Sequence, residues 1–225
     1  IEVEETLAVS SPETAVKSHR FVNQICDPED IEKLHTPRIT LDAAEEAAIV
    51  ETARRVFEGI LPFHMVGMTM HLGIWDSISM WMGVENCYIE LMDRPEMMHQ
   101  LMEKLTRGLI DMVGQLNALQ AFDIHSHICH CSHTYLEDLP ASEQAVSANA
   151  WAFGLAQLFT SVSPAITDEF EVAYMQRVFP LFGAIYYGCC DRLDDRLDII
   201  EKLPRVRKIS CSPWSDRERF AANLD

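Results

Sequence analysis

The spacing of apolar side chains predicts helices in several parts of the chain. Residues 41–59 carry an apolar stripe at helical spacing, with Asp42 placed to cap the first turn and Gly59 at the end. A second long helix is expected over residues 93–116, because Asp93-Arg94-Pro95-Glu96 is a typical helix start. The same spacing, together with helix-breaking prolines, predicts shorter helices at about 69–92, 142–160, 165–179 and 192–203, and another that begins after Trp214.

Short apolar runs between these helices predict strands at 60–67, 121–131, 181–187 and 206–212. Strand, loop and helix therefore alternate at least four times. This alternation is typical of a parallel sheet with covering helices, either open or closed into a barrel. Residues 1–40 are polar and irregular in pattern, so they are expected to form a separate N-terminal segment.

The segment 121–133 contains an unusual density of metal-binding side chains. Read at a period of two, one face carries Asp123, His125, His127, Cys129, Cys131 and His133. Imidazoles and thiols bind transition metals, and His127 and Cys129 are close enough on one face to share an ion with a third ligand from elsewhere. The alternative interpretation is a buried strand that runs into a surface loop rich in histidine and cysteine.

Further reactive side chains follow the other predicted strands. His64 ends the first strand, Tyr187, Cys189, Cys190 and Asp191 end the third, and Trp214 follows the fourth. Ligands of parallel α/β folds bind at the carboxyl ends of strands, which favours a site at these positions. Each residue also has a structural interpretation. Asp191 is then only a helix cap, the thiols belong to the core, His64 and His71 are structural histidines, and Trp214 packs against its neighbours.

Composition narrows the function classes. The chain has 225 residues and a formal net charge of −17, which argues against nucleic acid or an anionic membrane as a partner. No apolar run reaches the length of a membrane span. Seven cysteines in no disulfide-scaffold spacing, and an acidic start unlike a signal peptide, indicate a cytoplasmic protein with reduced thiols. Neither a phosphate-binding glycine loop nor a G-x-S-x-G elbow is present, which disfavours nucleotide-dependent chemistry and serine hydrolysis.

Four stretches resemble the uroporphyrinogen decarboxylase-like superfamily, which includes corrinoid- and thiol-dependent methyltransferases. They are Glu90-Leu91-Met92-Asp93-Arg94-Pro95-Glu96, Val162-Ser163-Pro164, Tyr186-Tyr187-Gly188-Cys189-Cys190-Asp191 and Arg207-Lys208-Ile209-Ser210-Cys211-Ser212-Pro213-Trp214. The resemblance covers roughly residues 55–225 and implies a TIM-type (β/α)8 barrel. Family members are longer, so residues 41–225 are expected to form part of such a barrel. A second copy in a homo-oligomer would then cover exposed edges.

The resemblance implies two chemistries. The methyltransferase branch moves a methyl group between a small methylated compound, a corrinoid or a thiol, with zinc held by a His-x-Cys pair and a later Cys. His127-Ile128-Cys129 fits this pair by spacing, with Cys189 or Cys190 as the third ligand. By position, however, the pair corresponds to Tyr187-Gly188-Cys189, where Tyr stands for His. Both placements remain open.

In the methyltransferase reading, His125 or Asp191 orients the substrate, His64, Tyr187 and Trp214 line its pocket, and a corrinoid protein is a potential partner. The second chemistry is a cofactor-independent decarboxylation of a uroporphyrinogen-like tetrapyrrole. Family decarboxylases hold the substrate carboxylates with an Arg-bearing segment near the start of the chain, and no such segment is found here. A third possibility is a non-catalytic binding or assembly subunit, which an incomplete barrel would suit.

Overall fold

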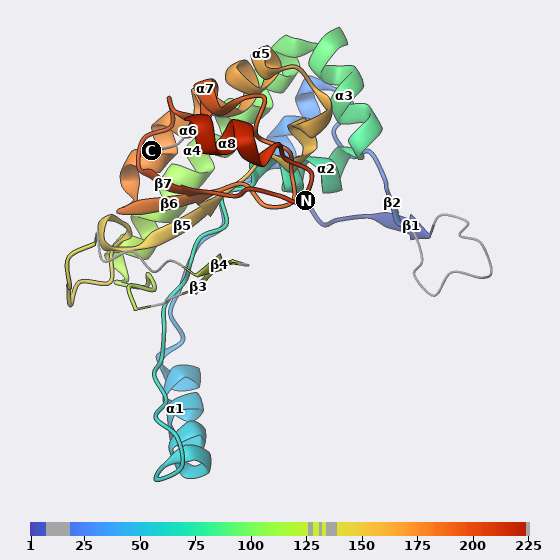
Figure 1. Cartoon of the computed structure of the whole chain (residues 1–225). Helices are drawn as coiled ribbons and strands as arrows, with labels where there is room; N and C mark the ends of the chain where they lie inside the picture. The colour runs from blue at the N-terminus through green and yellow to red at the C-terminus, as the bar shows by residue number, and fades with distance from the viewer. Residues whose placement is uncertain (8–18, 126–127, 131, 134–138, 224–225) are drawn as a thin grey trace, which may run out of the picture.

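The structure is a computed structural model, and it describes residues 1–225 with the exception of 8–18, 126–127, 131, 134–138 and 224–225 (Figure 1). Two long helices follow the predicted pattern. Helix α1 spans Ala43–Phe57 and is capped by Asp42, whose Oδ1 accepts hydrogen bonds from the backbone N–H groups of Ala44 and Glu45. Both the helix and its predicted cap are confirmed.

Helix α4 spans Pro95–Ala118 and confirms the second long helix, although its start differs from the prediction. Asp93 is the last residue of helix α3 (Val84–Asp93), and Arg94 occupies the N-cap position instead. The two helices are separated by one residue, so Asp93 is used to complete one helix rather than to cap the next. Helix α2 (Ile74–Met82) and α3 confirm the short helices expected over 69–92.

A three-stranded parallel sheet forms the centre of the second half of the chain. Its order is β5 (Trp151–Gly154), β6 (Ala184–Tyr187) and β7 (Val206–Ile209). Strands β6 and β7 confirm two predicted strands. Strand β5 falls inside the predicted helix 142–160, so that prediction was wrong. All four β5 residues are buried, and a continuous apolar run is typical of parallel strands covered on both faces.

The first half of the chain adds an irregular edge to this sheet. His71 forms a parallel bridge to Phe153 of β5, and Met68 forms one to Phe122. The predicted strand 60–67 is absent from the structure, since pairing begins only at Met68. Within 121–131, the described residues hold the Phe122 bridge and strand β3 (Ile128–Cys129). Strand β3 pairs antiparallel with β4 (Ser132–His133). The described residues therefore form these short elements and not the single strand predicted over 121–131.

Helical segments connect the parallel strands. Between β5 and β6, one helical run consists of α5 (Pro164–Thr167), a π-helical turn η4 (Asp168–Val172) and α6 (Ala173–Val178), which confirms the helix predicted at 165–179. Helix α7 (Leu197–Ile200) connects β6 to β7 and is much shorter than the predicted 192–203. Helix α8 (Arg217–Asn223) follows β7. The short 3₁₀ helices are η1 (Pro28–Lys33), η2 (Ser147–Asn149), η3 (Gln157–Ser161) and η5 (Phe179–Leu181).

These elements give two consecutive strand–helix–strand units, as expected for an α/β protein. The described strands do not close into a barrel, and the TIM-type arrangement remains a prediction. Residues Ile25, Ile31 and Leu34 are buried in the main core, so the N-terminal segment contributes to the folded body. A hairpin of β1 (Glu5–Leu7) and β2 (His19–Phe21) precedes them.

Helix α1 stands apart from the other helices (Figure 1), and none of its residues is buried. Its apolar stripe therefore faces solvent: Ile49, Val56 and Phe57 are exposed. Among the described residues, no helix combines the length and the apolar character needed to cross a bilayer.

Candidate functional site: the carboxyl end of strand β6

The chain turns sharply where β6 ends, and this turn brings four predicted site residues together. Gly188 has a φ of +87°, a conformation that residues with a side chain rarely adopt. After it, the backbone N–H of Cys189 donates to Asp191 Oδ1 at 2.7 Å, and the Ser210 hydroxyl donates to the Cys189 carbonyl. Tyr187, Cys189, Cys190 and Asp191 therefore occupy one short turn, fixed by hydrogen bonds to Asp191 and to the residue after β7.

The thiols of Cys189 and Cys190 lie 3.6 Å apart, with Cys189 half-buried and Cys190 exposed. Two thiolates on one tetrahedral zinc, each at about 2.3 Å, would lie roughly 3.8 Å apart, so the pair fits zinc in donor type and spacing. A structural zinc site needs four ligands, however. The part of the chain that the structure describes contains no group of three or more His, Cys, Asp and Glu side chains placed to hold an ion.

The expected helix does not follow these cysteines directly. The chain continues through bends and turns until α7 begins at Leu197. A helix N-terminus at this position would favour a thiolate, but it acts on charges mainly within its first turn, and neither Cys189 nor Cys190 lies there. Asp191 does not cap a helix either. It is buried, and its carboxylate holds the turn at Cys189.

Glu171 is the most unusual charged side chain near this turn. It lies in the π-helical turn η4, it is fully buried, and neither of its carboxyl oxygens has a hydrogen-bond partner among the described residues. Burial raises the pKa of Glu171 well above 4.5, and the nearby carboxylates of Asp76 and Asp191 raise it further. The Tyr187 hydroxyl lies close enough to oppose this shift weakly. The surroundings of the buried carboxyl therefore favour its neutral form over its charged form.

Tyr187 is the polar neighbour of Glu171 and is equally enclosed. Burial raises the pKa of the Tyr187 phenol well above 10, with further contributions from Glu171 and Asp191, while Arg196 acts in the opposite direction. Arg196 is itself buried and donates to the Phe159 carbonyl and to Thr167 Oγ1. Tyr187 and Glu171 thus form a pair of neutral proton donors under the carboxyl end of β6.

Asp76 and His71 link this buried pair to the surface. The Asp76 side chain is 41% exposed, and burial of the rest raises its pKa. The His71 ring accepts a hydrogen bond at Nδ1 from the Gly73 N–H, and its Nε2 lies 3.8 Å from Asp76 Oδ2. Burial lowers the pKa of His71, which favours the neutral imidazole. We refer to Asp76, Glu171 and Asp191 as the carboxylate cluster.

A second histidine, His130, lies near His71. The ring of His130 stacks on Phe153 of β5 with centroids 4.1 Å apart, and it lies 6.1 Å from the His71 ring. The described residue His130 of the segment 121–133 is therefore brought to the sheet, and the predicted metal site in this segment stays a prediction. His125 is exposed, and its backbone N–H donates to Asp123 Oδ1.

The remaining predicted site residues are spread over the molecule. His64 is exposed in the segment after α1, and Trp214 is 76% exposed after β7. His127 lies outside the described residues, and only the backbone of Cys129 is described, in β3. The structure thus places Tyr187, Cys189, Cys190 and Asp191 together, and His64 and Trp214 elsewhere on the surface.

Sequence reasoning missed Glu171, Asp76 and the pairing of His71 with Asp76. Asp168-Glu169-Phe170-Glu171 resembles the solvated face of a helix, although Glu171 lies four residues after Thr167 and four before Met175, which are both buried. The sequence gives only a weak signal that Glu171 is buried. Glu169 and Glu171 flank the apolar Phe170, and the apolar Val172 follows directly. Asp76 lies in the first turn of α2, where an acidic side chain is common because it interacts favourably with the helix dipole. Nothing in the sequence therefore marks it as a site residue.

Comparisons with protein-family models, with curated proteins and with solved structures give no match for this chain. The functional interpretation therefore depends on the residues at the carboxyl end of β6 and on the resemblance of their sequence.

Proposed function

We propose that the chain is a methyltransferase-like enzyme of the uroporphyrinogen decarboxylase superfamily. The observation that carries the proposal is the adjacent pair of thiols, Cys189 and Cys190, at the carboxyl end of a parallel strand. Ligands of parallel α/β proteins bind at this end of the sheet. Thiols are the side chains that hold zinc for thiol activation, and the buried Asp191 accepts a hydrogen bond from the Cys189 backbone N–H.

In this proposal, His127 and Cys129 together with Cys189 or Cys190 would hold zinc, which would supply the acidity that lowers the pKa of a bound thiol. The thiol would lose its proton to solvent, and its sulfur would bond to the methyl carbon while the bond between that carbon and the donor breaks and its electron pair leaves with the donor. The methyl group comes from a small methylated compound or from a corrinoid carried by a partner protein. Asp191 keeps the turn in place through its bond to the Cys189 N–H, and His125 or Asp191 orients the substrate.

The test combines metal content with methyl transfer. The chain is expressed with zinc and without a histidine tag, and transfer from methylcobalamin to a small thiol is followed. We expect about one zinc per chain, and we expect Cys189→Ala or Cys190→Ala to lose both zinc and transfer. Cys211→Ala is the matched control, because Cys211 is an exposed cysteine after the neighbouring strand β7. The proposal fails if the Cys189 and Cys190 variants retain both properties.

A second candidate function is favoured by Glu171. A decarboxylase that works without a cofactor must protonate the carbanion left after carbon dioxide departs, and a neutral carboxyl buried beside Tyr187 is suited to supply that proton. Measurable carbon dioxide release from a uroporphyrinogen without added cofactor, lost in Glu171→Gln, would support this alternative. Turnover of neither substrate would instead favour a binding or assembly subunit.

A further inference from the structure

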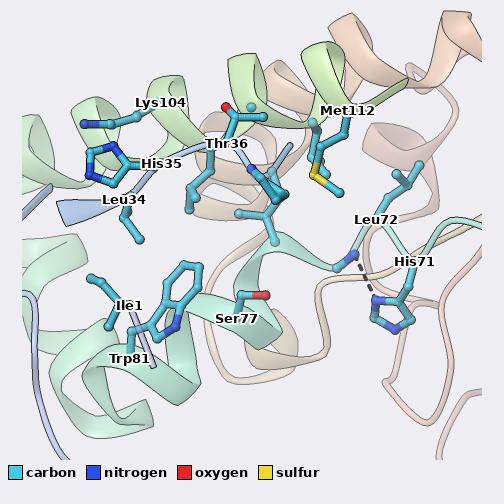
Figure 2. A pocket seen from close by; sticks show the side chains of 16 residues that line it. Ile1, Leu34, His35, Thr36, His71, Leu72, Ser77, Trp81, Lys104 and Met112 are labelled. Carbon is cyan, nitrogen blue, oxygen red and sulfur yellow. Dashed lines mark hydrogen bonds between the residues drawn. The ribbon is translucent and has the colours of Figure 1, made fainter. Parts of the chain in front are cut away.

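A cavity of about 660 Å³ lies between helices α2 and α4, apart from the thiols at the end of β6 (Figure 2). Its volume falls within the range of small-molecule sites, roughly 300–1,000 Å³. Figure 2 shows α4 along one side and α2 along the other, with His71 at one end and Lys104 and His35 toward the opposite end. The cavity is therefore elongated, and its two ends differ in chemistry.

The walls between the two ends are mainly apolar. Leu105, Leu109 and Met112 line the cavity from α4, and Ile74 and Trp81 line it from α2. Except for Ile74, these side chains are only partly buried, although they pack against the main core. A concave surface of half-buried apolar groups gains free energy when an apolar ligand removes it from water, at about 25 cal/mol per Å².

One end of the cavity is basic, in a chain whose formal net charge is −17. Lys104 Nζ lies 2.8 Å from Glu32 Oε2, and the Glu32 side chain is 82% exposed. The Glu32 pKa is lowered chiefly by Lys104, with smaller contributions from His35 and Arg107. Lys104 and His35 line this end of the cavity, while Arg107 lies outside it and is paired with Glu103 at 3.4 Å.

The two partners of the Lys104–Glu32 pair differ in exposure: the Lys104 side chain is only 25% exposed, whereas the Glu32 side chain is 82% exposed. Glu32 therefore loses little when it turns to water, and Lys104 needs a negative partner. A carboxylate presented from the cavity can replace Glu32 beside Lys104 and keep the charge of Lys104 compensated. Glu32 would then turn to solvent, where it is already largely exposed.

The opposite end of the cavity offers no such charge. The His71 ring accepts a hydrogen bond at Nδ1 from the Gly73 N–H, and its Nε2 lies 3.8 Å from Asp76 Oδ2, so this end carries an acidic neighbour that would repel a carboxylate. A Cβ at Gly73 would lie 2.7 Å from His71 Cε1, so Gly73 lets the ring lie close to the backbone. A ligand would therefore place its apolar end here and its charged end at Lys104.

We propose that this cavity binds an elongated small molecule with an apolar body and a single carboxylate, which pairs with Lys104. The apolar body lies between α2 and α4, against Trp81 and Met112. The inference does not depend on methyl transfer, since it uses none of the residues at the carboxyl end of β6 that carry the proposed function.

The test is calorimetric titration of the whole chain with decanoate and, separately, with decanol at concentrations below aggregation. Decanoate should bind, and Lys104→Met should weaken its binding by about three- to tenfold, the range of a partly exposed charge pair, while the affinity for decanol stays unchanged. Equal loss for both ligands, or no loss for decanoate, would overturn the assignment of the carboxylate to Lys104.

A matched pair of glycines on α4 tests the location of the ligand. Gly108 lines the cavity, whereas Gly114 is exposed and a Cβ there would meet nothing within 4 Å. Both changes to leucine raise helix propensity. Gly108→Leu should therefore reduce binding of both ligands at least tenfold by filling the cavity, and Gly114→Leu should not. Unchanged binding in Gly108→Leu, or absence of binding in the unmodified chain, would refute the proposal.

Discussion

Trp75 Nε1 donates a hydrogen bond to the backbone carbonyl of Phe170 at 3.2 Å, which ties helix α2 to the π-helical turn that holds Glu171. Trp75 is fully buried and also packs edge-on against Phe159, with ring centroids 4.6 Å apart. The position of Glu171 therefore depends on a contact between segments that are 95 residues apart in sequence. Asp76, the neighbour of Trp75, reaches the same region through the same helix.

Trp75→Phe should destabilise the fold. The change removes the donor and leaves the buried Phe170 carbonyl without it, at a cost of about 1–3 kcal/mol in the free energy of unfolding. Urea denaturation measures the difference. Trp214→Phe is the matched control, because Trp214 is 76% exposed, and surface changes usually stay within about 0.5 kcal/mol. Equal stability of the two variants would contradict the role of this hydrogen bond.

Glu171→Gln should change how stability depends on pH. The folded-state pKa of Glu171 is raised above its unfolded value of 4.5, so the unfolded chain releases a proton that the folded chain retains. Stability from this group is complete below pH 4.5 and falls as pH rises toward the folded pKa, by up to about 1.4 kcal/mol per pH unit. Gln does not titrate, and the variant should gain stability relative to the unmodified chain as pH increases above 4.5.

Denaturation at a series of pH values from 4 to 8 measures this difference. Glu169→Gln serves as a control on the same π-helical turn, because the Glu169 side chain is 55% exposed, and its difference from the unmodified chain should vary much less with pH. A pH-independent difference for Glu171→Gln would show that the buried carboxyl does not hold its proton.

Gly188→Ala should be more harmful than Gly83→Ala. Both glycines have positive φ, +87° and +79°, so both changes impose backbone strain of about 1–2 kcal/mol. At Gly83 the nearest atom to an added Cβ is 3.4 Å away, whereas at Gly188 it is Leu193 Cδ1 at 2.5 Å. Crowding should add about 1–3 kcal/mol at Gly188 alone. Thermal unfolding of the two variants measures the loss of stability from backbone strain alone at Gly83 and from strain plus crowding at Gly188. Equal losses of stability would contradict the close contact in the turn after β6.

Thiol labelling should distinguish the cysteines by burial. Cys190, Cys26 and Cys211 are exposed and should react with a disulfide reagent in the native chain at pH 8. Cys87 is fully buried, and burial raises the pKa of its thiol to about 12, so it should react only after unfolding. Mass spectrometry of labelled peptides identifies each site. Native labelling of Cys87 at the rate of Cys190 would contradict the burial of α3 against the core.

The parts of the fold set by local pattern were predictable from sequence. Apolar periodicity located α1 and α4, and apolar runs located β6 and β7. Strand β5 was missed because Ala148, Ala150 and Ala152 favour a helix locally, whereas burial between neighbouring strands decides the outcome. Tertiary contacts of this kind cannot be read from a window of the sequence.

The candidate site shows the same division. Tyr187, Cys189, Cys190 and Asp191 were found because they follow a recognisable strand. Glu171 was not, since its burial depends on how the run from Pro164 to Val178 packs against distant segments such as α2, which is bonded to the Phe170 carbonyl through Trp75. A charged residue in a helix is solvated by default, and sequence alone does not reveal the neighbours that enclose it.

The π-helical turn at Asp168–Val172 makes the position of the Glu171 carboxyl depend on the number of residues in this stretch. Such turns commonly contain one residue more than an α-helix needs, and each residue of an α-helix advances by about 100°. Loss of a single residue from this stretch would return the run from Pro164 to Val178 to regular α-helical phase. The part of the run before the lost residue would then be rotated by about 100° relative to the part after it, so Thr167 and Met175 could not both keep the buried positions that they share with Glu171.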